Sequence, residues 1–308
     1  MTGLELARAY YEEFGAPMIH NIFPGYESRI ACGLAGSGSE CFGFDDEKSQ
    51  DHDFGSGFCL WLTDEDYEKI GDDLTAEYQN LPNTFKGFPA KEMILSGEHR
   101  VGPMRISDYY SKFTGTLGVP QTLEQWRRIP ENFLATAVNG EVFRDDLGEY
   151  TAFREALLAF YPEDIRLKKM VARIAVMAQA GQYNYPRCVQ RGEWVAAMCA
   201  VGEFVEATCS MVYLLNKKYA PFYKWAHRGM KYLSVLPGVY DLLSLLCAEG
   251  TDAKRREDLI EEICVSVGDE LRRQGLSETE DDFLLEHCGD LMNKISDPGI
   301  RQLHIMAE

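Results

Sequence analysis

The chain has 308 residues and a formal net charge of −18, from 31 Lys and Arg against 49 Asp and Glu. This balance excludes a uniformly basic binder of nucleic acids or of anionic membrane surfaces, because both depend on a surplus of Lys and Arg. The composition, 45% hydrophobic and 26% charged, is that of a folded globular protein, and the length suggests about two domains.

The first half of the sequence mixes predicted helices with short strands. Helices are indicated by the apolar pattern of Leu4–Phe14 and by the acidic segment Asp64–Tyr78, for which Thr63 is the expected N-cap. Short apolar or β-rich runs predict strands within Arg29–Ala35, Phe54–Leu62, Lys91–Ser96 and Val101–Ile106.

After Pro162 the pattern is helical almost throughout. Apolar residues recur at i, i+3 and i+4 in two segments, 167–178 and 259–271. Glu193–Lys218 is long and largely apolar, which is typical of the central helix of a bundle. The sequence therefore predicts an α+β fold, with a small mixed β-sheet domain at 1–148 and a C-terminal helical bundle at 149–308.

The charge is distributed unevenly between these two parts. The segment from Glu40 to Glu77 has 13 acidic residues and two lysines, whereas 165–240 has 11 Lys or Arg and three Glu. An acidic domain that faces a basic one is suited to hold a metal–polyphosphate between them. The alternative is that most of these charges lie on solvated helix faces.

Neither disulfides nor a membrane span is indicated. The nine cysteines are odd in number and contain no C-x-x-C pair, which argues against a disulfide framework and a zinc ribbon. The first residues lack the pattern of a signal peptide, and no run of 18 apolar residues occurs. We therefore expect a reduced, cytoplasmic protein without a membrane partner.

A glycine- and serine-rich turn, Gly36-Ser-Gly-Ser-Glu40, follows the first predicted strand. Its glycines allow the backbone to approach a ligand, and the following residues can open a helix whose free N–H groups attract phosphate. Asp51 and Asp53 come next; on a strand, their spacing would place both carboxylates on one face, roughly 6.6 Å apart along the backbone. Two carboxylates beside a phosphate-binding turn would form a Mg²⁺ site.

Each part of this pattern also has a structural interpretation. Ser37 and Glu40 have the spacing of a capping box, and the segment with Asp51 and Asp53 could be a polar turn. Their combination after an apolar strand favours the metal–phosphate interpretation. A calcium loop is excluded because its bidentate position would be Leu62, and the sequence has no P-loop motif.

The Gly36-Ser37 and Asp51-x-Asp53 pair resembles the G-S…D-x-D signature of the DNA polymerase β-like nucleotidyltransferase superfamily. More narrowly, the sequence from about residue 28 to 236 resembles the DUF4037 family of bacterial proteins assigned to that fold. The further segments that carry this resemblance are Phe143–Gly148, Tyr161–Asp164 and Tyr219–Trp225. The resemblance implies a mixed sheet followed by a helical domain, as in kanamycin-type nucleotidyltransferases.

The resemblance also implies roles for individual residues. Gly36 and Ser37 would hold the β- and γ-phosphates of a nucleotide, and Asp51 and Asp53 would bind Mg²⁺. Ser39, in the same turn, is a further candidate for nucleotide binding.

The superfamily usually adds a third carboxylate on a later strand. The strand candidate at 101–106 contains no acid, so the nearest choices are Glu98 before it and Asp108 after it. We favour Asp108 as the third catalytic carboxylate; the alternative is that Asp108 caps the helix that follows.

Two basic residues of the second domain are candidates for binding the nucleotide. Lys224 lies in a stretch from Ala207 to Tyr240 that contains no acid, and Arg187 follows a polar break in the helical pattern. A cation at either position could approach the triphosphate; the alternative for Lys224 is a surface lysine that covers aromatic rings.

The sequence thus predicts a Mg²⁺-dependent enzyme that transfers an NMP, with ATP as the favoured NTP, to a hydroxyl group of an unknown acceptor. The overall acidity favours a small cationic acceptor over a nucleic acid, but the basic second domain leaves tRNA or protein acceptors open. The alternative is a catalytically inactive nucleotide-binding or interaction module of the same fold.

Overall fold

The computed structural model describes residues 1–51, 54–95 and 98–307, without the side chains of Gln50 and Asp51. The chain divides into two compact units, Met1–Pro120 with Phe133–Ala159, and Gln121–Asn132 with Phe160–Glu308. The expected boundary at 148/149 therefore falls inside the first unit, and 121–132 belongs to the second. The reason for the second difference is that α5 (Leu123–Arg128) packs on α8 (Glu163–Val176).

The first unit is built on a four-stranded mixed sheet with the strand order β7-β2-β1-β8. β1 pairs antiparallel with both β2 and β8, whereas β2 pairs parallel with β7. The strands are β1 (Ala31–Leu34), β2 (Cys59–Leu62), β7 (Gly102–Arg105) and β8 (Glu141–Arg144). β1, β2 and β7 lie within segments where strands were predicted, and β8 was not predicted.

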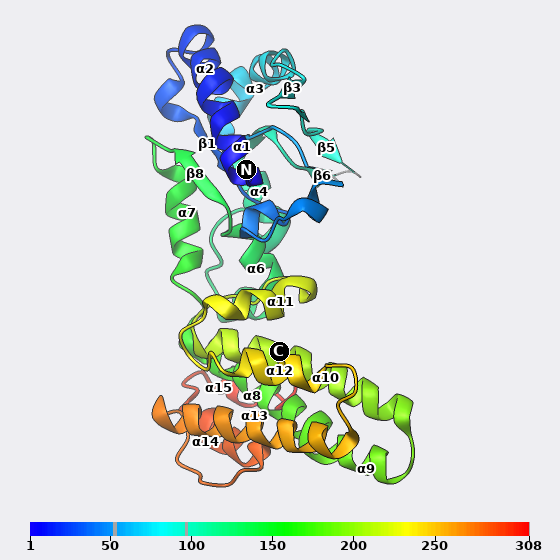
Figure 1. Ribbon diagram of the computed structural model, residues 1–308. Coiled ribbons are helices and arrows are strands. Elements are labelled where there is room, and N and C mark those ends of the chain that lie inside the picture. The colour runs from blue at the N-terminus through cyan, green and yellow to red at the C-terminus, as the bar shows by residue number, and fades with distance from the viewer. Residues whose placement is uncertain (52–53, 96–97, 308) are drawn as a thin grey trace. The chain divides into compact units, whose positions relative to one another are not determined.

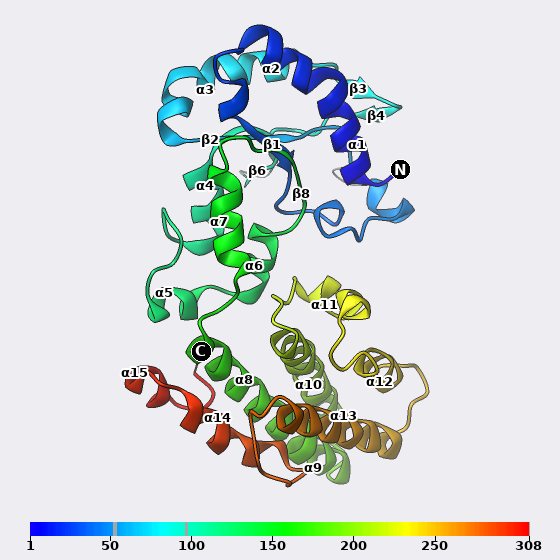
Figure 2. The same ribbon diagram turned by 90° about the vertical axis from the view of Figure 1, so that its left-hand side faces the viewer.

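Helices cover both faces of this sheet (Figure 2). Two aromatic residues pack against them: Trp61 of β2, and Phe58, which directly precedes β2. The ring of Phe58 contacts Tyr10 of α1 (Gly3–Tyr10) and Tyr78 of α3 (Asp64–Gln79). Trp61 instead stacks on Tyr150 of α7 (Glu149–Leu158), with ring centroids 3.9 Å apart. The alternation of side chains along a strand thus sends neighbouring aromatic residues into two separate layers of core.

The other described elements of the first unit are shorter. A π-helical turn, Tyr11–Gly15, joins α1 to α2 (Ala16–Ile22). Two hairpins, β3 (Thr84–Phe85) with β4 (Phe88–Pro89) and β5 (Ile94–Leu95) with β6 (Glu98–His99), lie between α3 and β7. β7 leads directly into α4 (Ile106–Thr114), and α6 (Glu131–Ala137) precedes β8.

The second unit is helical (Figure 1). Its central helix, α10 (Trp194–Leu215), packs against α8, α9 (Tyr185–Gln190) and the π-helical segment Met177–Asn184. The remaining helices are α11 (Tyr223–Gly229), α12 (Val239–Leu246), α13 (Ala253–Arg273), α14 (Cys288–Lys294) and α15 (Pro298–Arg301). The expected α+β architecture, a small mixed sheet followed by a largely helical region, is confirmed.

α10 is long and apolar enough to span a membrane by length and composition alone. The C-terminal half of this helix, from Ala207 to Leu215, is buried without interruption. A central helix of a bundle has the same composition as a span, and the packing of α10 against α8 and α9 is that of a core helix.

Candidate functional site

The turn after β1 adopts a backbone that requires glycine. Gly36 has φ +113° and Gly38 has φ +139°, both in the left-handed half of conformational space. A Cβ atom on Gly38 would lie 2.5 Å from Oε2 of Glu40. The turn continues into a single 3₁₀ turn, Glu40–Phe42, preceded by Ser39, whose side chain makes no capping hydrogen bond. The expected helix with a phosphate-binding N-terminus is therefore absent from this part of the described chain.

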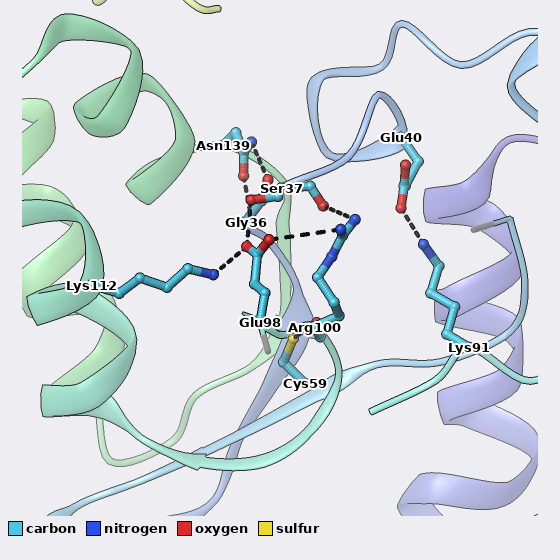
Figure 3. Close-up of polar contacts among 9 residues, drawn as sticks. All are labelled: Gly36, Ser37, Glu40, Cys59, Lys91, Glu98, Arg100, Lys112 and Asn139. Atoms are coloured by element: carbon cyan, nitrogen blue, oxygen red, sulfur yellow. Dashed lines mark hydrogen bonds and ion pairs between the residues drawn. The ribbon is translucent and has the colours of Figure 1, made fainter. Parts of the chain in front are cut away.

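An asparagine just before β8, the strand that pairs with the end of β1, holds the turn in place. The Nδ2 group of Asn139 donates to the carbonyl of Gly36, and the N–H of Gly36 donates to Oδ1 of Asn139, each over 2.8 Å. Because both atoms of the amide are used, the side chain acts as a clamp on the first residue of the turn (Figure 3).

A carboxylate contacts the hydroxyl group of the turn. Ser37 Oγ donates to Oε1 of Glu98 over 2.6 Å, and the Nζ of Lys112 on α4 contacts the same oxygen. Arg100 donates from Nη2 to the carbonyl of Ser37 over 2.6 Å, while its Nη1 lies 3.9 Å from Oε2 of Glu98. Figure 3 shows these four side chains converging from the turn, the β5–β6 hairpin and α4.

The charge of Glu98 follows from its neighbours. Burial by itself would raise the pKa of this carboxyl, but the hydrogen bonds from Lys112 and Ser37 and the charge of Arg100 outweigh it, so the pKa is lowered. Glu98 is therefore ionised at neutral pH. A carboxylate with a lowered pKa suits a metal ligand or an anchor for cations better than a general base, which needs a pKa near the working pH.

A second ion pair supports the turn from its other side. Glu40 and Lys91 form an ion pair in which both side chains are more than nine-tenths buried. The capping-box alternative for Ser37 and Glu40 is thus not formed, because each side chain has a different partner. The nearby thiol of Cys59 donates to the carbonyl of Arg100 over 3.4 Å, and burial raises its pKa to about 12, so it stays neutral.

The two predicted metal ligands are only partly covered by the structure. Asp51 is the last residue of the 3₁₀-helix Glu47–Asp51, so it does not lie on a strand as expected, and β2 begins only at Cys59. Asp53 lies outside the described residues. Among the residues whose side chains are described, no group of three or more His, Cys, Asp or Glu is placed to hold a metal ion.

Asp108, the expected third carboxylate, has a different environment from Glu98. It lies in the first turn of α4, its side chain is 68% exposed, and its ion pair is with Arg105, at 3.7 Å. Of the two acids next to β7, it is Glu98 that contacts Ser37.

Lys224 and Arg187 both belong to the second unit, and each covers an aromatic ring. The Nζ of Lys224 lies 4.4 Å from the ring centre of Trp225, and the guanidinium carbon of Arg187 lies 4.7 Å from that of Tyr183. Both side chains are exposed. Their contribution to nucleotide binding stays a prediction.

Sequence reasoning missed Arg100, Lys112 and Asn139. A usable signal existed for two of them: Arg100 ends the polar turn before a predicted strand, and Asn139-Gly140 is a typical turn pair. Lys112 had no such signal, because one lysine in an amphipathic helix is indistinguishable from a solvated one until the helix is placed.

Two segments that carried the family resemblance have structural roles. Asp145 accepts from the N–H groups of Gly148 and Thr151, which caps the start of α7. Asp164 accepts from the N–H groups of Ser296 and Asp297, which fastens the segment before α15 to α8.

Comparison with known protein families agrees with the resemblance over part of the chain. Residues 126–226 match DUF4037, a domain of unknown function. This confirms the expected similarity to DUF4037 for that region, which contains the motifs at 143–148, 161–164 and 219–225 but not Gly36 or Ser37.

Among solved structures, the chain is similar to a nucleotidyltransferase-like protein from Exiguobacterium sibiricum 255-15. The identity is 15%, the TM-score is 0.35, and the match covers 94% of this chain and 91% of that one. No curated protein sequence shows significant similarity to this chain.

Proposed function

We propose that this protein is a Mg²⁺-dependent nucleotidyltransferase, which moves an NMP, with ATP as the favoured donor, to a hydroxyl group of an acceptor. The main support is the 2.6 Å hydrogen bond between Ser37 and Glu98, which joins the glycine–serine turn to an ionised carboxylate. Two cations, Arg100 and Lys112, lie at the same point. Hydroxyl, cations and carboxylate are the groups that a metal–triphosphate requires.

In this proposal Ser37, Arg100 and Lys112 bind phosphate oxygens, and Asp51, Asp53 and Glu98 hold Mg²⁺. Three carboxylates fit this ion by chemistry, since Mg²⁺ prefers oxygen ligands. When bound, the ion would neutralise charge that develops on the phosphates. Because Ser37 and Lys112 both contact Glu98 in the structure, an incoming phosphate would compete for these donors and release Glu98.

The reaction balances without a further reactant. The acceptor oxygen forms a bond to the α-phosphorus, and the bond from that phosphorus to the oxygen bridging to the β-phosphate breaks. Pyrophosphate leaves with the electron pair, and the hydroxyl proton passes to solvent. The chain's part is to orient the triphosphate and to stabilise its charge.

The test uses ATP labelled at the α-phosphate, Mg²⁺ and a panel of acceptors. We expect Asp51→Ala/Asp53→Ala to lower transfer by about 100-fold or more and Glu98→Gln by about 10- to 100-fold. Asp108→Asn is the matched control and should change transfer by less than about twofold, as an exposed charge outside the site.

Three outcomes are decisive. If ATP does not bind, or if it binds and is transferred equally well without Asp51 and Asp53, the proposed function is wrong. If Asp108→Asn abolishes transfer and Glu98→Gln does not, the third carboxylate is Asp108. Binding that depends on Asp51 and Asp53 without transfer to any acceptor would identify the inactive nucleotide-binding module.

A further inference from the structure

The segment around α11 has an unusual surface for so acidic a protein. No acidic residue occurs from Ala207 to Tyr240, and Lys224, Arg228 and Lys231 are all exposed there. Two tyrosines of the same segment project into solvent, with Tyr223 74% and Tyr232 75% exposed. We call these five residues the α11 surface.

Helical spacing places most of the α11 surface on one side. Lys224, Arg228, Lys231 and Tyr232 stand at i, i+4, i+7 and i+8 through α11 and the 3₁₀ turn Met230–Tyr232 that follows it. The opposite side, which includes Ala226, Gly229 and Met230, is buried. The exposed residues therefore form a continuous stripe rather than scattered positions.

Hydrogen bonds from α10 and Asn216 fix the backbone of α11 and of the segment that follows it. The Tyr213 hydroxyl of α10 donates to the carbonyl of Ala226 over 3.0 Å. The side chain of Asn216 accepts from the N–H of Val235 and donates to its carbonyl, which fixes the chain after the stripe. Exposed rings on a fixed backbone lose little conformational entropy when they stack on a ligand.

The lysines of the stripe lie over aromatic rings. Lys224 Nζ is 4.4 Å from the ring centre of Trp225, and Lys231 Nζ is 4.9 Å from that of Tyr240. Within the described part of the chain neither lysine forms an ion pair. Their charge is therefore not neutralised by a carboxylate and is available to an external anion.

We propose that the α11 surface binds single-stranded nucleic acid. Unpaired bases stack on exposed aromatic rings, and neighbouring cations bind the phosphates between them; this combination is typical of single-strand binding surfaces. The net charge of −18 comes largely from acidic residues elsewhere in the chain. At physiological ionic strength salt screens charges more than about 8 Å away, so these residues oppose binding at the α11 surface only weakly.

Two other polyanions fit the surface less well. A membrane surface would require an apolar face to insert, but the apolar side of α11 is buried and the helix packs on α10. An acidic protein would use the cations but would not require two exposed aromatic rings beside them.

The test measures binding of the full-length protein to fluorescent 12-nucleotide RNA and DNA oligomers by anisotropy, without NTP. Three phosphate contacts predict a slope of log affinity against log salt of about −2, which Lys224→Gln should reduce to about −1.4. Tyr223→Ala and Tyr232→Ala should each weaken binding by about 5- to 150-fold. Exposed residues of the same unit serve as controls: Trp194→Ala and Lys294→Gln should leave binding unchanged.

The outcomes separate this proposal from the proposed function. Oligomer binding that survives Asp51→Ala/Asp53→Ala but is lost in the tyrosine variants supports the surface, whatever the transfer assay shows. The proposal is overturned if the tyrosine variants bind as tightly as the parent protein. It is equally overturned if polyglutamate or phosphatidylserine vesicles bind to the α11 surface and the oligomers do not.

Discussion

The Glu98 carboxylate is partly buried, and its hydrogen-bond partners keep it ionised. Its Oε1 atom accepts a hydrogen bond from Ser37 and forms an ion pair with Lys112. These contacts lower the pKa of Glu98 below the ordinary value of 4.5. Nothing in the local sequence distinguishes it from Asp108, which stands ten positions further along. Only the placement of the β5–β6 hairpin beside the turn separates the two acids.

Glu98→Gln should destabilise the protein in a pH-dependent way. A pKa lowered by folding stabilises the folded state above pH 4.5, and this contribution is lost as the pH falls through the folded-state pKa. We expect a loss of about 1 to 2 kcal/mol at pH 7 that shrinks as the pH falls below 4.5. Urea unfolding at a series of pH values measures it.

Glu68→Gln, which removes an exposed partner of Arg105 in the same unit, is the control and should cost less than about 0.5 kcal/mol. A deficit for Glu98→Gln that is the same at pH 3 and pH 7 would show that its charge does not stabilise the fold.

At the scale of single elements, prediction succeeded where the local signal was strong. α3 begins after Thr63 as expected, because the Thr63 hydroxyl accepts from the N–H of Asp66 over 3.2 Å. The apolar residues that recur at helical spacing within 259–271 are all buried in α13: Leu259, Ile260, Ile263, Cys264, Val267 and Leu271. In both cases the information lies within a few residues of the chain.

Elements that depend on distant partners were missed. β8 is only partly buried along its length and is a strand because β1 supplies its hydrogen bonds. The segment after the glycine–serine turn forms a single 3₁₀ turn that ends at Gly43 in the left-handed conformation, and Glu40 of this turn pairs with Lys91, 51 residues away. Such tertiary contacts override local pattern.

Thr63→Ala should shorten or weaken α3. The free energy of unfolding should fall by about 1 kcal/mol, because the N–H of Asp66 loses its acceptor and the Asp66 carboxylate loses a donor. Thr75→Ala in the interior of the same helix is the matched control and should be neutral or slightly stabilising, since alanine is the better helix former. Chemical denaturation of both variants compares them; equal losses would contradict the capping role of Thr63.

At the scale of the whole molecule, the net charge hides an uneven distribution of acidic and basic residues along the chain. The sequence located the basic stretch at 165–240 correctly, but not which of its charges face solvent. Arg166, Lys168 and Lys169 are buried in α8, whereas Lys224, Arg228 and Lys231 are exposed. Burial depends on the packing of the bundle, so charge counts along the chain overstate the basic surface.

Lys168 connects α8 to the C-terminal residues of the second unit. Its side chain is fully buried, and its Nζ donates to the carbonyls of His304 and Ile305 over 2.9 and 2.8 Å. Removal of residues 304–308 should cost about 2 to 4 kcal/mol, because a buried ammonium loses two acceptors.

A double-mutant cycle with Lys168→Met tests this origin of the loss. Truncation should cost less in the Lys168→Met background, where no buried ammonium loses the carbonyls of His304 and Ile305. The same cycle with Lys294→Met, an exposed lysine of α14, should be additive. Additivity in the Lys168 cycle as well would contradict the proposed role of this contact.

The path of the chain between the two units also governs how they can form. The polypeptide passes from one unit to the other after Pro120, after Asn132 and after Ala159. During synthesis, α5 leaves the ribosome before β8 completes the sheet, and α5 must wait for α8 before it gains its packing partner. A single cut at any point releases at most one complete unit and leaves the other without a segment. The smallest chain that contains all of the first unit is therefore one in which Pro120 is joined to Phe133 by a linker.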